Sequence, residues 1–304
     1  MELYLKHRPA SFADVAGQKE AVGTLARLGK DGEIPHALLF TGPSGTGKTT
    51  LARILASKLK CGQADFVETN AADFRGIDTI RDIARQCGSA PLDGPCRIWL
   101  IDEVHQLTGA AQDAFLKLLE DTPRHVYFFL ATTDSQKLKK TIITRCTEVR
   151  CKPLSATDLT ALVKSVAAKE KMDVGDDVIK KVVEVADGSG RKSLVILHAI
   201  RNVPPSEQIG AIENVDSGVQ SIELARALIY PGKHWSDVAA ILKDITDEPE
   251  SVRYMILGYC RTILLGGGRM AARAAVVIEE FRDNFYDSKA AGLAVACWNA
   301  MQSV

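Results

Sequence analysis

The sequence predicts an α/β domain with a parallel five-stranded sheet and helices on both faces, followed by domains made only of helices. In residues 18–151, short apolar runs alternate with segments of helical periodicity, which is typical of a mostly parallel sheet. After Lys152-Pro153 the strand-like runs end, and the rest of the chain shows helical periodicity alone. These two observations define the expected fold class.

Five segments of the first half are predicted to be strands because they are short, largely apolar and bounded by turn residues. They are Ala37–Thr41, Phe66–Asn70, Arg97–Asp102, Val126–Ala131 and Thr147–Cys151. The helices expected between them are Gln18–Leu28, Thr49–Lys60, Ile77–Cys87 and Ala110–Glu120. Residues 88–95 (GSAPLDGP) are expected to form a turn-rich loop before the third strand.

Three domains are expected: residues 1–152 as the α/β domain, 153–204 as a small helical lid, and 205–304 as a helical collar. The best linker candidate is the sequence VPPS at residues 203–206. Apolar residues of the last domain recur at helical spacing, at Val219, Ile222, Ala225, Leu228 and Ile229. This stripe fits an oligomer contact and an intramolecular core equally well.

The composition is ordinary for a soluble globular protein, with 46% hydrophobic and 25% charged residues. Lys+Arg and Asp+Glu both number 38, so any contact with DNA must come from a local patch. The sequence shows neither an apolar run long enough to span a bilayer nor a leader-like start, so we expect a cytoplasmic protein with no membrane partner. Seven scattered cysteines without a C-x-x-C pair argue against a zinc site or a disulfide framework.

Residues Gly42–Thr49 (GPSGTGKT) match the phosphate-binding pattern GxxxxGK[ST]. Its glycines let consecutive backbone N–H groups converge on phosphate oxygens, and the following helix directs its positive end at them. Lys48 is expected to hold the β- and γ-phosphates, and the Thr49 hydroxyl to hold Mg²⁺. ATP and Mg²⁺ are therefore the predicted cofactors. The expected nucleotide contacts of this loop are Gly42, Pro43, Ser44, Gly45, Thr46, Gly47, Lys48, Thr49 and Thr50.

Two further strands end in polar residues. Asp102 and Glu103 follow the apolar run at 98–101, where Asp102 is suited to hold Mg²⁺ and Glu103 to deprotonate the attacking water. Thr133 follows the strand at 126–131, either as a sensor of the γ-phosphate or as a plain strand cap. His105 is expected to be a hydrogen-bonded structural group. The carboxyl ends of parallel strands meet at one edge, so these groups are expected near the phosphate loop.

Together these motifs resemble the AAA+ ATPases and, within them, the clamp loaders of DNA replication, over about the first two-thirds of the chain. Residues 7–18 (HRPASFADVAGQ) resemble the adenine-pocket segment of that family, with His7 in place of the usual tyrosine. The resemblance implies that the base is contacted by Arg8, Pro9, Val15 and Gly17. Residues 188–194 (GSGRKSL) resemble the sensor-2 segment, which implies that Arg191 contacts the nucleotide from the lid.

Two segments resemble the bacterial gamma-type loader subunit: Asp102–His105 (DEVH) and residues 129–146. The likeness implies that Thr133 is the sensor-1 residue. It also implies that Arg145 is an arginine finger, acting in trans on the γ-phosphate of a neighbouring subunit. Threonine stands at position 144 where the family has serine. The catalytic group implied by the resemblance is Glu103, Lys48, Arg145 and Thr133.

Residues 70–81 (NAADFRGIDTIR) resemble the segment of replication factor C small subunits that faces primer–template DNA. The likeness implies sequence-independent phosphate contacts from Arg75, Gly76, Ile77 and Arg81. The alternative is a solvated, arginine-bearing helix face. Residues 86–92 follow that helix, where family members touch the sliding clamp, but no distinctive residue marks such a contact here.

The resemblance implies a DNA-stimulated ATPase subunit of a pentameric ring, homo- or hetero-oligomeric, that opens a sliding clamp and loads it on primer–template DNA. The alternatives are a hexameric DNA motor of the branch-migration type, which would end in a winged helix with a β-hairpin, and a subunit that binds ATP without hydrolysing it. Cys61 stands alone where gamma-type subunits have a four-cysteine zinc insertion, and the chain ends after one helical third domain. A compact loader from a phage or another small replication system is therefore expected, with an archaeal or eukaryotic-like small subunit as the next alternative. The sequence identifies neither the partner subunits, nor the clamp, nor the stoichiometry.

Overall fold

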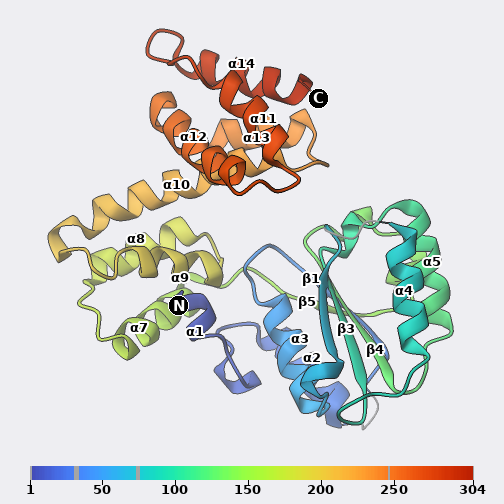
Figure 1. Cartoon of the computed structure of the whole chain (residues 1–304). Coiled ribbons are helices and arrows are strands. Elements are labelled where there is room, and N and C mark those ends of the chain that lie inside the picture. The colour runs from blue at the N-terminus through green and yellow to red at the C-terminus, as the bar shows by residue number, and fades with distance from the viewer. Residues whose placement is uncertain (1, 31–33, 73–75, 246, 304) are drawn as a thin grey trace. The chain divides into compact units, whose positions relative to one another are not determined.

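The computed structural model describes residues 2–30, 34–72, 76–245 and 247–303, with the side chains of 29–30 and 213–219 outside that description. It divides into two compact units, residues 1–201 and 202–304 (Figure 1). The expected division between 152 and 153 lies inside the first unit and stays a prediction. Within the described residues, every helix is too short or too polar to cross a bilayer.

The first unit contains a five-stranded sheet with strand order β2-β3-β4-β1-β5, in which every neighbouring pair is parallel. The strands are β1 (Ala37–Thr41), β2 (Phe66–Asn70), β3 (Arg97–Asp102), β4 (Val126–Thr132) and β5 (Thr147–Arg150). This confirms the predicted sheet. β4 is one residue longer than expected and β5 one residue shorter.

Helices cover both faces of this sheet because strand side chains alternate between its two sides (Figure 1). Leu38 and Phe40 of β1 pack in one cluster with α2 and α3, whereas Leu39 packs in the opposite cluster with α4 and α5. These helices are α2 (Lys19–Lys30), α3 (Lys48–Lys58), α4 (Ile77–Cys87) and α5 (Gly109–Glu120). Shorter elements are α1 (Leu3–Lys6), η1 (Phe12–Asp14), η2 (Gln63–Asp65), η3 (Val104–Gln106), η4 (Ser135–Lys137) and α6 (Lys140–Ile143).

Three helices complete the first unit: α7 (Ala156–Lys169), α8 (Asp176–Ala186) and α9 (Gly190–Ala199). Two of them begin at serines whose hydroxyls accept a backbone N–H of the first turn, Ser155 from Asp158 and Ser189 from Lys192. α8 ends at Asp187, whose backbone is left-handed. The predicted break at DGSG therefore lies between α8 and α9.

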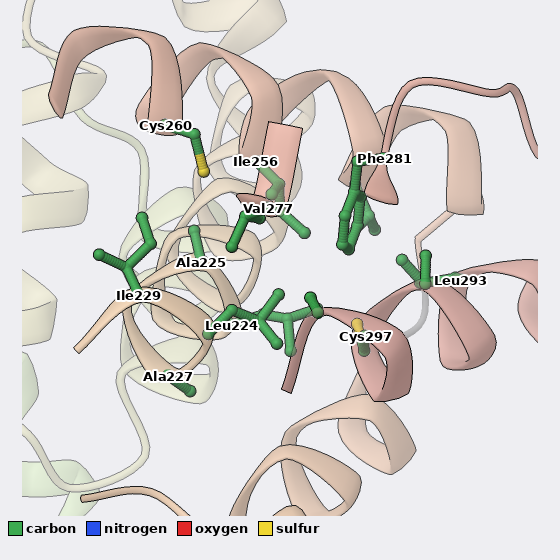
Figure 2. Packing of buried hydrophobic residues seen from close by; sticks show 14 of the residues in the cluster. Leu224, Ala225, Ala227, Ile229, Ile256, Cys260, Val277, Phe281, Leu293 and Cys297 are labelled. Atoms are coloured by element: carbon green, nitrogen blue, oxygen red, sulfur yellow. The ribbon is translucent and has the colours of Figure 1, made fainter. Parts of the chain in front are cut away.

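The second unit is helical. Its elements are η5 (Pro205–Glu207), α10 (Gln208–Ile229), α11 (Trp235–Asp244), α12 (Pro249–Leu265), α13 (Ala271–Glu280) and α14 (Lys289–Gln302). Figure 2 shows its core, where Ala225 and Ile229 of α10 lie among Ile256, Val277 and Cys297. Leu228 is buried in the same cluster, and Ile222 is half-buried. The alternative of an intramolecular core therefore holds for Ala225, Leu228 and Ile229, while the Val219 side chain lies outside the description.

A buried ion pair holds the loop at residues 88–95. The Asp65 carboxylate, fully buried, accepts hydrogen bonds from the Arg97 guanidinium (2.8 Å to Nη2) and from the backbone N–H groups of Leu92 and Asp93. Arg97 also donates to the Gln86 carbonyl at 2.7 Å. Burial alone would raise the pKa of Asp65, but these hydrogen bonds outweigh it and hold the pKa below its usual value.

Replacing Asp65 by Ala is expected to lower the free energy of unfolding by about 3–5 kcal/mol, because it leaves the Arg97 guanidinium buried without its anion. Urea unfolding measures this change. The matched control is Asp82→Ala, which removes an exposed i,i+3 pair with Arg85 and is expected to change the free energy by less than about 1 kcal/mol. Equal effects of the two substitutions would contradict the structural role assigned to Asp65.

Candidate nucleotide-binding and hydrolysis site

A pocket opens at the carboxyl edge of the sheet, where β1 and β3 end. Of the residues predicted to contact nucleotide or metal, those lining it are Arg8, Pro9, Val15, Ser44, Gly45, Thr46, Gly47, Lys48, Thr49, Thr50, Asp102, Glu103 and Arg191. Predicted nucleotide or catalytic residues that do not line it are Gly17, Gly42, Pro43, Thr133 and Arg145. The topology thus gathers segments from residues 8–15, 44–50, 102–103 and 191 around one cavity.

Two glycines of the phosphate loop are required by both conformation and space. Gly42 has φ +138°, and a Cβ there would lie 2.0 Å from the Cys151 carbonyl oxygen. Gly45 has φ +73°, and its Cβ would lie 2.1 Å from Ser189 Oγ. Only glycine avoids both the strain of a positive φ and the steric clash of a Cβ atom. The loop therefore packs tightly between β5 and the start of α9, where the Arg191 N–H donates to the Gly45 carbonyl at 3.3 Å.

Lys48 is almost fully buried beneath the loop. Its ammonium donates to the carbonyls of Gly42 (2.7 Å) and Pro43 (2.8 Å). Burial lowers the pKa of Lys48, and the nearby carboxylates of Glu103 and Asp102 oppose that shift. A cation held this way is poised to exchange carbonyl contacts for phosphate oxygens.

The two predicted Mg²⁺ ligands lie side by side. Thr49 Oγ1 donates to Asp102 Oδ2 at 3.1 Å, so the start of α3 and the end of β3 present a hydroxyl and a carboxylate at one point. Hard oxygen donors of this kind suit Mg²⁺, which takes few protein ligands and completes its shell with water and phosphate. The residues present therefore fit the ion.

Glu103 adopts a left-handed backbone, with φ +49° and ψ +41°, which is costly for a residue that is not glycine. Its Oε2 accepts a hydrogen bond from Thr133 Oγ1 at 2.9 Å. β3 and β4 are hydrogen-bonded neighbours, so the residues that come after them meet. Thr133 thus contacts the predicted catalytic carboxylate although it does not line the pocket.

The N-terminal wall of the pocket is fixed by a buried carboxylate. The side chain of Glu170, at the end of α7, is only 2% exposed. Its carboxylate oxygens lie 2.6 Å from Lys6 Nζ and His7 Nε2 and 3.0 Å from Arg201 Nη2. Hydrogen bonds from Lys6 and His7 lower the pKa of Glu170 to about 2. His7, at the position of the family tyrosine, lines the pocket and is anchored to the lid helices.

Several residues that contribute to the site were not predicted, among them Tyr4 and Gln18. Tyr4 lines the pocket, with the Arg191 guanidinium 5.7 Å from its ring centroid. Gln18 donates through Nε2 to the Thr46 carbonyl at 3.1 Å and accepts from the Lys152 N–H at 3.1 Å. The available signal for Gln18 was its place beside Gly17 in the segment already matched to the adenine pocket; Tyr4 carried no comparable motif.

Arg145 is bound to groups outside the residues that line the pocket of its own chain. Its guanidinium donates to the Thr141 carbonyl at 3.1 Å and pairs with Glu120, and its side chain is 39% exposed. Among the residues that the structure describes, it does not line the cavity that holds Lys48. A positive group in this position is accessible to a second molecule.

Three of the predicted DNA-contacting residues, Gly76, Ile77 and Arg81, lie at the start of α4. Gly76 is the N-cap residue, Ile77 begins the helix, and Arg81 is exposed and pairs with Asp78 at 2.9 Å. Arg75 lies outside the described residues. The DNA role of this segment stays a prediction.

Comparisons with known proteins agree with this geometry. Residues 38–154 match the family model described as "ATPase family associated with various cellular activities (AAA)". The chain is 31% identical to the DNA polymerase III subunit gamma/tau of Mycobacterium tuberculosis, over 93% of this chain and 50% of that protein. It is 34% identical to subunit tau of Bacillus subtilis, over 64% of this chain and 38% of that protein. The chain thus spans half, or less, of the length of these two relatives.

Solved structures of similar fold include the Thermotoga maritima RuvB Holliday junction branch migration motor. The match has a TM-score of 0.59 and 22% identity, and covers 78% of this chain and 85% of that one. At this identity the likeness shows the fold. The match to the Mycobacterium tuberculosis subunit covers more of this chain, 93%, than the match to that structure. Residues 38–154 therefore match the AAA ATPase family, and the chain is similar to the gamma/tau subunit of DNA polymerase III over 93% of its length.

Proposed function

We propose that this chain is an ATP-hydrolysing subunit of a clamp loader, which opens a sliding clamp and loads it on primer–template DNA in the cytoplasm. The observation that carries the proposal is the similarity to DNA polymerase III gamma/tau subunits over 93% of the chain. The pocket supports it, because it gathers Lys48, Thr49, Asp102 and Glu103 at one edge of the sheet.

In the proposed reaction the loop amides and Lys48 hold the phosphates of ATP, and Arg8 and Arg191 border the rest of the nucleotide. Mg²⁺, held by Thr49 and Asp102, neutralises phosphate charge when bound. The Glu103 carboxylate takes a proton from a water molecule while the oxygen of that water bonds to the γ-phosphorus. The bond from that phosphorus to the β–γ bridging oxygen breaks, which yields ADP and phosphate.

Neighbouring subunits complete the proposed site. Arg145 is exposed outside its own pocket, so we assign it to the γ-phosphate in the pocket of the next subunit. ATP binding would then order a ring, which we propose is pentameric. The start of α4 would contact the DNA backbone inside the ring, and hydrolysis would release the clamp.

The second candidate is a hexameric DNA motor of the branch-migration type. The RuvB structures share the fold of this chain, but at 22% identity they carry no argument about function. The described part of the second unit is built from helices α10 to α14, which matches a helical collar better than a winged helix with a β-hairpin. The similarity to the gamma/tau subunit of Mycobacterium tuberculosis, which covers 93% of this chain, also favours the loader.

ATP hydrolysis measured with primer–template DNA, with a candidate clamp, and with both separates these two functions. For a loader, DNA and clamp added together are expected to raise the rate by a larger factor than the two separate stimulation factors multiplied. A DNA motor is expected to respond to DNA and to ignore the clamp, and that result would overturn the proposal. Lys48→Ala, which removes the phosphate-binding cation, provides the background rate.

A further inference from the structure

We propose that His105 is a positioning residue that holds the Glu103 carboxylate through its Nδ1–H and so fixes the orientation in which Glu103 meets water. The proposal rests on the proposed role of Glu103 in ATP hydrolysis. His105 lies in η3, two residues after Glu103, and its side chain is only 7% exposed. A buried ring beside a catalytic carboxylate restricts where that carboxylate can point.

For a neutral His105 ring, the contact with Gln106 indicates which nitrogen carries the proton. The Gln106 amide nitrogen lies 3.0 Å from His105 Nε2. An amide nitrogen only donates, so Nε2 accepts this hydrogen bond. The single ring proton therefore lies on Nδ1, which makes Nδ1 the donor.

Two acceptors surround that proton. Thr132 Oγ1 lies 3.0 Å from Nδ1, and Glu103 Oε2 lies 3.2 Å from it. Thr132 is fully buried at the end of β4, and its hydroxyl oxygen also accepts the Asp134 N–H at 3.0 Å. The ring is thus fixed against the sheet on one side and faces the carboxylate on the other.

The backbone of Glu103 has an unfavourable conformation that contacts from its surroundings must stabilise. A left-handed conformation at a residue other than glycine persists only where the surroundings determine it. Oε2 of Glu103 is approached by two donors, Thr133 Oγ1 at 2.9 Å and His105 Nδ1 at 3.2 Å. Thr133 was already expected at the site from its motif, whereas the function of His105 is inferred only from these contacts.

The test compares two amides that mimic different ring nitrogens, in the assembled protein with primer–template DNA and clamp. His105→Asn places an amide near the position of Nδ1 and is expected to keep most of kcat. His105→Gln places it near Nε2 and is expected to lower kcat on the order of 100-fold, the cost of a misplaced catalytic group. KM for ATP is expected to stay unchanged in both variants.

His36→Gln is the matched control, because His36 is also held by hydrogen bonding, to the Val126 carbonyl at 2.7 Å, but lies outside the pocket. Melting temperatures of all variants show whether each one folds. Equal kcat for the Asn and Gln variants would overturn the positioning role. If Glu103→Gln itself retained hydrolysis, the proposed function of the site would fail instead, so the two failures are distinguishable.

Discussion

The Glu103→Gln variant is expected to bind ATP normally and to lose almost all turnover. Glutamine keeps the shape of the side chain and its contact with Thr133, but its amide does not take a proton from water. Loss of a general base lowers kcat by about 100- to 10,000-fold. Single-turnover hydrolysis with DNA and clamp, together with binding of a fluorescent ATP analogue, measures both halves of this result.

Glu184→Gln is the control for removing a carboxylate, since Glu184 lies exposed on α8. It is expected to leave both ATP binding and turnover at the level of the parent protein. Unchanged DNA-stimulated hydrolysis in Glu103→Gln would contradict the assignment of Glu103 as the base.

The Arg145→Ala variant is expected to lose cooperative hydrolysis while each subunit still binds ATP. Arg145 does not line the pocket around Lys48 in its own chain, so ATP binding is expected to be preserved. An arginine finger accelerates phosphoryl transfer by about 1,000-fold or more, and its loss is expected to cost that factor. Rates in the assembled complex measure the effect.

A mixture of two inactive variants tests whether Arg145 acts in trans. Arg145→Ala subunits keep the pocket, and Lys48→Ala subunits keep the arginine. Where they alternate, hydrolysis is expected to reappear at the shared interfaces. Arg150→Ala, which removes another exposed arginine of the same unit, is expected to be active alone. If the mixture stays inactive while Arg145→Ala subunits still assemble, the trans role is wrong.

Much of the fold was predictable because its signals are local. The structure places β1, β2 and β3 at the expected bounds, and the apolar runs of β1 and β3 are followed directly by turn or charged residues. The nucleotide pocket was predictable for a related reason. Most of its motifs come directly after a strand, and parallel strands bring the residues at their carboxyl ends to one edge of the sheet.

The remaining features depend on contacts between distant parts of the chain. Glu170 meets His7 across 163 residues, and Gln18 meets Lys152 across 134. No periodicity or motif predicts such pairs, because they depend on how segments distant in the sequence pack in the folded unit. The expected phage origin, the clamp contact and the DNA contact stay predictions, because they concern the source of the chain and its partners.

The carboxylate of Glu170 has a mechanical consequence. Arg201 is the last residue of the first unit, so the point where the chain leaves that unit is tied to Glu170. The same carboxylate holds His7 in the wall of the pocket. Glu170 therefore joins the end of the first unit to the wall of the pocket, in parallel with α9, whose Gly190, Arg191 and Leu194 line the same pocket.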